Sequence, residues 1–216
     1  MKQTSDLNSV LEPRTYSRDD SAVFHKTREE FGGLSNMASG YPLFVSGVRI
    51  LSSEALYQCC RFPHLPKVQQ EIIEQTSPMT AKMKSKPHRD QTREDWEEVK
   101  VAIMKWCIKL KLVEHWSRFS ALLLSTDSKP IVELSRRDAF WGAILSRDGK
   151  TLVGANVLGR LLMDIRERVK ADPDAFSTVF PLPISNFTIL GRPIEPVCCD
   201  INRFADSPPQ QKQLMF

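Results

Sequence analysis

The segment from residue 92 to residue 115 carries the longest regular apolar pattern in the chain, and this pattern predicts a helical core. Apolar residues recur there every three or four positions, which places their side chains on one face of an α-helix. Thr92-x-x-Asp95 resembles a capping box at its start. The apolar face of this long predicted helix consists of Trp96, Val99, Ile103, Trp106, Cys107, Leu110 and Val113.

Shorter patterns around this helix predict an α+β, mainly helical fold. Residues 42–51 alternate between apolar and other residues around Ser46-Gly47, which is typical of a β-hairpin with a tight turn. Ser52 and Ser53 then offer a cap for a helix that Pro63 and Pro66 end. Further helices are expected over residues 67–75, 78–84, 118–124 and about 156–170, and a strand over residues 130–134.

Length and composition indicate a single globular domain with two appended segments. Of the 216 residues, residues 1–22 are polar without periodicity and predict a flexible segment. Residues 23–170 hold the hairpin and the helices. Residues 171–216 are punctuated by prolines and predict an extended or small β appendage with a disordered end. Because no apolar run is long enough to span a bilayer, no membrane partner is expected.

The cysteines and histidines indicate neither a metal site nor a disulfide framework. The five cysteines form no CxxC pair, and the four histidines are scattered. The first residues lack the apolar core of a secretory signal, so a reduced, cytoplasmic setting is expected. The net charge of +4 permits contact with phosphates but does not demand nucleic acid.

Two acids lie next to aromatic residues and are candidates for an active site. Glu54 begins the helix after the hairpin, where the helix dipole alone would stabilise a carboxylate. Its apolar neighbours favour a desolvated cleft, which suits proton transfer. In the segment from Asp138 to Gly142, Asp138 is either a cap or a ligand of ribose hydroxyls, and Trp141 is either a core anchor or a stacking ring.

Several other segments have both a structural and a functional interpretation. Residues 154–159 open a helix and either bind phosphate at its amino terminus or simply contain an N-cap, Asn156. The basic stretch over residues 82–93 is a solvated loop or a rim for pyrophosphate. Lys100 shares a helical face with Trp96 and Met104, so it is a snorkelling lysine or, if desolvated, a nucleophilic amine.

The order of these motifs resembles the NADAR (YbiA-like) family across residues 31–170. The usual Glu-His-x-x-Gln of the family reads Glu54-Ala-Leu-Tyr-Gln58 here. The matching motifs are Leu34-Ser35-Asn36, Ser53-Glu54…Gln58…Phe62, Ser77-Pro78, Arg93-x-Asp95-Trp96-Glu97-x-Val99-Lys100, Val132-Glu133, Asp138-x-x-Trp141-Gly142 and Asn156-x-Leu158-Gly159-x-Leu161-Leu162-Met163.

This resemblance implies an N-glycosidase that cleaves the bond between C1 of a ribose and a nitrogen. Some members act on pyrimidine intermediates of riboflavin synthesis. Others remove ADP-ribose from guanine in nucleic acid, and some of these are antitoxins against DarT-type DNA ADP-ribosyltransferases. Gly-Gly-Leu-Ser-Asn-Met together with Ser-Ser-Glu-Ala-Leu-Tyr-Gln resembles the antitoxin branch. Hydrolysis of ADP-ribosyl-guanine is therefore the expected activity, with single-stranded DNA or a free nucleotide as substrate and a cognate transferase as a further candidate partner.

The expected roles of the site residues follow from that resemblance together with the residue chemistry. Glu54 is expected to transfer a proton, Asp138 to hold the ribose, and Lys100 to be the amine that traps an opened ribose as an imine. No metal and no cofactor is expected. The alternatives are an enzyme of riboflavin synthesis and a non-catalytic protein that binds ADP-ribose or a toxin. The expected ligand contacts are Ser35, Asn36, Tyr57, Gln58, Lys82, Lys86, Arg93, Trp96, Trp141, Gly142, Asn156 and Gly159.

Overall fold

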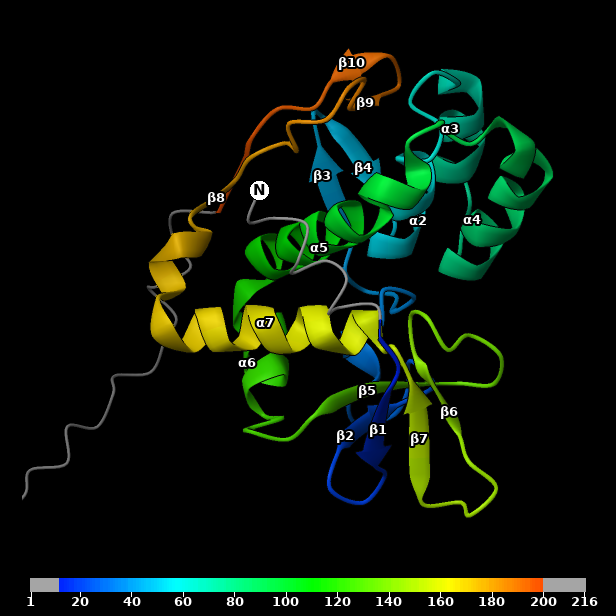
Figure 1. Cartoon of the computed structure of the whole chain (residues 1–216). Coiled ribbons are helices and arrows are strands. Elements are labelled where there is room, and N and C mark those ends of the chain that lie inside the picture. Colours follow the sequence, from blue (N-terminus) through cyan, green and yellow to red (C-terminus); the bar gives the residue numbers. More distant parts are fainter. Residues whose placement is uncertain (1–11, 200–216) are drawn as a thin grey trace, which may run out of the picture.

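The computed structural model describes residues 12–199, which form a mixed sheet and a helical layer (Figure 1). In the helical layer, α5 and α7 run side by side, and the sheet lies beyond α7. The predicted α+β, mainly helical fold is therefore confirmed. The helices are α2 (Ser53–Cys59), α3 (Pro66–Ile73), α4 (Pro78–Ser85), α5 (Trp96–Glu114), α6 (Trp116–Leu124) and α7 (Val157–Ala171).

The main sheet has five strands in the order β1-β7-β6-β5-β2. β5 pairs in parallel with both β2 and β6, whereas β7 pairs antiparallel with β6 and β1. The flexible segment expected up to residue 22 is wrong for its last part, because β1 hydrogen-bonds to β7 there. The strands are β1 (Arg14–Ser17), β2 (Ala22–Phe24), β5 (Ile131–Ser135), β6 (Ala143–Leu145) and β7 (Thr151–Gly154).

The hairpin and the helix caps form largely as the sequence predicts. β3 (Leu43–Val45) and β4 (Val48–Ile50) pair across a tight turn in which both Ser46 and Gly47 have positive φ. The Ser52 hydroxyl accepts a hydrogen bond from the N–H of Ala55 at 3.2 Å and caps α2. The capping box at Thr92 is wrong: Asp95 is the N-cap of α5, and its carboxylate binds the Arg93 guanidinium instead of the helix.

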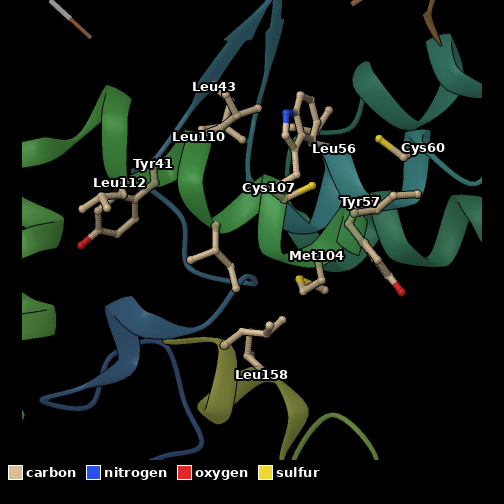
Figure 2. Packing of buried hydrophobic residues seen from close by; sticks show 14 of the residues in the cluster. Tyr41, Leu43, Leu56, Tyr57, Cys60, Met104, Cys107, Leu110, Leu112 and Leu158 are labelled. Atoms are coloured by element: carbon tan, nitrogen blue, oxygen red, sulfur yellow. The ribbon is translucent and has the colours of Figure 1, made fainter. Parts of the chain in front are cut away.

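The core is built around α5, which contacts α2 on one side and α7 on the other. Figure 2 shows Met104, Cys107 and Leu110 of α5 among side chains of α2 and Leu158 of α7. Cys107 and Leu110 are fully buried. Burial of such apolar side chains stabilises the fold by roughly 2 kcal/mol each.

The proline-rich appendage packs on the helices as far as it is described. Gln69 of α3 donates from Nε2 to the carbonyl of Thr188 at 3.1 Å and accepts from the N–H of Leu190 at 2.6 Å. The disorder expected at the end of the chain concerns residues outside the described ones. The elements here are η3 (Pro173–Phe176), β8 (Thr178–Val179), β9 (Thr188–Ile189), β10 (Arg192–Pro193) and β11 (Val197–Cys198).

Two findings bear on the setting of the protein. All five cysteines are free. Between residues 12 and 199, no helix is long and apolar enough to cross a membrane, and no cluster of side chains is suited to hold a metal ion.

One charged side chain of α5 is buried inside the core. Lys111 is 1% exposed, and its Nζ donates to the carbonyls of Gly33 at 2.5 Å and Ser35 at 2.9 Å. The rings of Tyr41 and Phe119 lie 4.2 and 4.5 Å from the same atom. Burial lowers the pKa of Lys111 well below its usual value. Lys111 therefore holds the loop at residues 33–35 against α5.

We predict that Lys111→Met lowers the free energy of unfolding by roughly 3 kcal/mol, because two buried carbonyls lose their donor. Urea denaturation of the variant and the wild type measures this loss. Lys109→Met is the matched control on the same helix: Lys109 is only half-buried, so a change below about 1 kcal/mol is expected. Equal stability of both variants would contradict this role of Lys111.

Candidate active site

A cleft of about 650 Å³ lies between helices α2, α4 and α5 and the end of strand β5. A volume of this size suits a nucleotide-sized ligand. Nine of the predicted site residues line it although they are far apart in sequence: Asn36, Glu54, Tyr57, Gln58, Lys82, Trp96, Lys100, Asp138 and Trp141.

Glu54 lies in the first turn of α2 and is only 2% exposed. Gln58, one turn later, donates from Nε2 to Glu54 Oε1 at 2.9 Å, and the Asn36 amide donates to Oε2. The Lys82 ammonium is 3.7 Å from Oε1. Both carboxylate oxygens therefore face hydrogen-bond donors, an arrangement that stabilises a buried negative charge.

The two amides around Glu54 are themselves held in place. Gln58 Oε1 accepts from the hydroxyl of Ser85 at 2.8 Å, which fixes which end of the amide faces Glu54. The carbonyl of Asn36 accepts from the N–H of Glu54 at 3.0 Å, so Asn36 binds both the backbone and the side chain of Glu54. These bonds orient the carboxylate before a ligand arrives.

Three aromatic rings line the cleft, but they are not equally accessible. Trp96 is 5% exposed, and the Arg61 guanidinium lies 4.7 Å from its ring centroid. Trp141 is partly exposed and meets Tyr57 edge-on at 5.7 Å. Trp141 is therefore the better placed of the two tryptophans to contact a base or a ribose.

Lys100 lines the cleft from α5 and is not a freely solvated lysine. Its ammonium forms an ion pair with Glu97 and lies 4.4 Å from the centroid of the Phe140 ring. To attack the carbonyl carbon of an opened ribose, Lys100 Nζ would first have to break its ion pair with Glu97.

Asp138 lies on the loop between β5 and β6 and has a structural role as well as a place in the cleft. Its Oδ1 accepts from the N–H groups of Phe140 and Trp141 at 3.0 and 2.9 Å. Asp138 thereby shapes the turn that carries Trp141. No hydrogen bond within residues 12–199 involves its Oδ2, which leaves that oxygen for a ligand.

The amino terminus of α7 is not a phosphate site. The N–H groups of Val157 and Leu158 donate to the carbonyls of Phe140 and Trp141, both at 3.0 Å. These carbonyls occupy the donors that a phosphate would need.

Asn156 corrects two expectations, because it neither caps α7 through its side chain nor reaches the cleft. It is fully buried with φ of 49°, and no side-chain capping bond forms. Its Nδ2 donates to the carbonyl of Ile131 at 2.8 Å, and its Oδ1 accepts from the N–H of Glu133 at 3.2 Å. Asn156 therefore ties the start of α7 to strand β5.

Five other expected ligand contacts also lie away from the cleft lining. Arg93 is buried and binds Asp95 and the carbonyl of Ser185, and Lys86 is exposed on η2 (Lys86–Gln91). The Ser35 hydroxyl accepts from the N–H of Met37. The two glycines permit close packing, since an added Cβ would meet the carbonyl of Glu133 at 2.4 Å from Gly142 and that of Ile131 at 2.1 Å from Gly159.

Comparison with known proteins establishes the family. The NADAR domain model matches residues 23–170. The chain belongs to the NADAR family. It is 34% identical over 152 residues to the N-glycosidase YbiA of Escherichia coli, covering 70% of this chain and 90% of that protein. It is also 31% identical to a riboflavin biosynthesis protein of Vibrio vulnificus, covering 73% of this chain and 41% of that protein.

A solved NADAR structure supports the fold. The solution structure of E. coli YbiA matches this one with a TM-score of 0.60 and 33% sequence identity, covering 71% of this chain and 88% of that chain.

The NADAR cleft also contains residues that the sequence analysis did not single out as site residues. Glu133 points from β5, and burial, reinforced by Glu54 and Asp138, raises its pKa to about 7. An acid next to Ile131-Val132 in a predicted strand is the signal that marks it in the sequence. The other residues are mostly basic or polar: His25, Arg61, Ser85, Arg89, Arg136 and Arg137.

Proposed function

We propose that this NADAR protein hydrolyses the N-glycosidic bond between ADP-ribose and guanine in nucleic acid, as the antitoxin to a DNA ADP-ribosyltransferase. The observation that carries the proposal is the distribution of charge in the cleft. Carboxylates line it at Glu54, Glu133 and Asp138, and cations line it on both walls. The five free cysteines suit a reducing compartment such as the cytoplasm.

The cations support a ligand with more than one phosphate. Lys82, Arg61 and Arg89 belong to the helical wall, whereas Arg136 and Arg137 follow strand β5 on the opposite wall. One guanidinium group can donate two hydrogen bonds to the oxygens of one phosphate. Cations on two walls of the cleft therefore suit the pyrophosphate of ADP-ribose. These arginines replace Lys86 and Arg93 in the expected role.

The carboxylates suit cleavage at C1 of a ribose. Departure of the base leaves an oxocarbenium-like centre, which a nearby anion stabilises. Glu54 is the anion whose position is most firmly fixed, and as a base it would accept a proton from the attacking water. Asp138 would bind ribose hydroxyls through Oδ2, and Trp141 would pack on the base or the ribose. A guanine in duplex DNA would have to be extruded, which favours single-stranded substrate.

Two alternatives use the same cleft. The similarity to a riboflavin biosynthesis protein of V. vulnificus favours hydrolysis of a ribosylamino-pyrimidine intermediate. A protein that binds ADP-ribose or a toxin without turnover would need the cations but not the carboxylates.

Parallel assays with two substrates test the proposal. We expect release of ADP-ribose from single-stranded DNA carrying ADP-ribosyl-guanine, and at least about tenfold slower turnover of the pyrimidine intermediate, because that compound engages fewer of the cations. Chromatography of the released products measures both rates. Faster turnover of the pyrimidine would reverse the assignment, and tight binding without turnover would favour the binding protein.

Glu54→Gln is expected to lower turnover about a hundredfold or more and to leave ADP-ribose affinity nearly unchanged, because the amide cannot accept the proton. Single-turnover kinetics and calorimetric titration measure the two quantities. A thermal melt of the same sample separates catalysis from folding. Unchanged release of ADP-ribose would remove Glu54 from the mechanism.

Experiments on Lys100 distinguish direct hydrolysis from a mechanism that passes through the opened ribose. If the amine forms an imine with C1, borohydride added during turnover leaves ADP-ribose on the Lys100 peptide, which mass spectrometry detects. Lys100→Arg keeps the ion pair with Glu97 but cannot form the imine, so it should be nearly inactive. Normal turnover of the arginine variant without an adduct would leave the carboxylates to act alone.

A further inference from the structure

The backbone of Glu133 is held in place from several sides. It lies on β5, where it pairs with Phe24 of β2, and its N–H donates to Asn156 Oδ1. Its carbonyl packs against Gly142, where no side chain would fit. Three partners outside β5 thus hold this one residue, while its side chain lines the cleft.

The surroundings of Glu133 and Glu54 differ in one decisive respect. Each oxygen of Glu54 accepts a hydrogen bond from an amide, and Lys82 lies nearby. Within residues 12–199, no hydrogen bond or ion pair reaches the carboxylate of Glu133. Burial and the neighbouring acids therefore favour a proton on Glu133, and its pKa is about 7. Two carboxylates with such different surroundings divide into a base and an acid.

The charged and titratable groups that share the cleft come from every surrounding element. Glu54 and Asp138 add negative charge near Glu133, which raises its pKa, and Lys82 opposes them. The remaining groups in the cleft are His25, Tyr57, Arg61, Arg89, Glu97, Lys100, Arg136 and Arg137.

We propose that Glu133 is the general acid that protonates the leaving nitrogen, an inference that rests on the proposed N-glycosidase function. As the bond between C1 and nitrogen breaks, its electron pair leaves with the nitrogen, which takes the proton of Glu133. The water oxygen adds to C1, and Glu54 takes the proton that water loses. Return of that proton from Glu54 to Glu133 through solvent restores both groups.

Asp138 is less suited to the role of the acid. It is exposed, and one of its oxygens already accepts two backbone hydrogen bonds. Its Oδ1 is therefore committed to the turn that carries Trp141.

The test compares two leaving groups on the same ADP-ribose, with the same configuration at C1. Guanine needs a proton to leave, whereas 4-nitrophenolate does not. We expect Glu133→Gln to lose about a hundredfold in turnover with guanine and less than about fivefold with nitrophenolate. Equal losses with both leaving groups, or no loss with guanine, would overturn the proposal.

The pH profile of the wild type gives a readout that needs no variant to fold. An acid must carry its proton, so turnover of the guanine substrate should fall as pH rises through about 7, whereas turnover of the nitrophenyl substrate should not. The same fall with both leaving groups would overturn the role of Glu133. A wild type inactive on both substrates would instead refute the proposed function.

Glu114→Gln is the matched control. Burial also raises the pKa of Glu114 to about 7, but this residue ends α5, where its carboxylate accepts from the N–H of Phe44 outside the cleft lining. The control should keep both the turnover and the fall near pH 7. If Glu114→Gln abolished the decrease in turnover near pH 7, the decrease would be assigned to Glu114, and the assignment to Glu133 would be overturned.

Discussion

The position of the Glu54 carboxylate depends on a lysine that is almost fully buried. Lys111 holds the carbonyls of Gly33 and Ser35, and the next residue, Asn36, binds Glu54 through both its carbonyl and its amide. Between Gly33 and Ser35, Leu34 is buried in the core, so apolar packing and the polar bonds of Lys111 hold the loop together. A single buried amine thus links the packing of α5 to the geometry at the start of α2. The stability of the fold and the position of the Glu54 carboxylate therefore depend on the same contact.

The charged groups of the cleft differ in exposure. The Glu54 side chain is almost fully buried, whereas Arg89, Arg136 and Arg137 are exposed. The exposed cations would attract an anionic ligand from a distance. Exposed cations are screened by salt and buried carboxylates much less. Substrate capture should accordingly depend on ionic strength more than the chemical step does.

Local patterns predicted the helices and the hairpin, because each signal lies within a few residues, and the resemblance to the NADAR family predicted much of the cleft lining. Ser52 caps α2, and Glu54, Gln58 and Lys100 all face the cleft. The errors are long-range. Asn156 looked like a helix cap, but its side chain binds a strand more than twenty residues earlier. The acid that follows Ile131-Val132 marks Glu133 in the sequence, but its raised pKa comes from burial and from the neighbouring Glu54 and Asp138, which only folding brings about.

The bond between Asn156 and β5 also bears on how such a protein can diversify. A shift of β5 by one residue would turn the Glu133 side chain to the opposite face of the sheet. The Asn156 amide hydrogen-bonds to Ile131 and Glu133, the residues on either side of Val132, and opposes this shift. Between β5 and Asn156, the loop that carries Arg136 and Arg137 is exposed and lines the cleft. Changes in this loop would alter the cleft lining while the Asn156 bonds keep Glu133 in place.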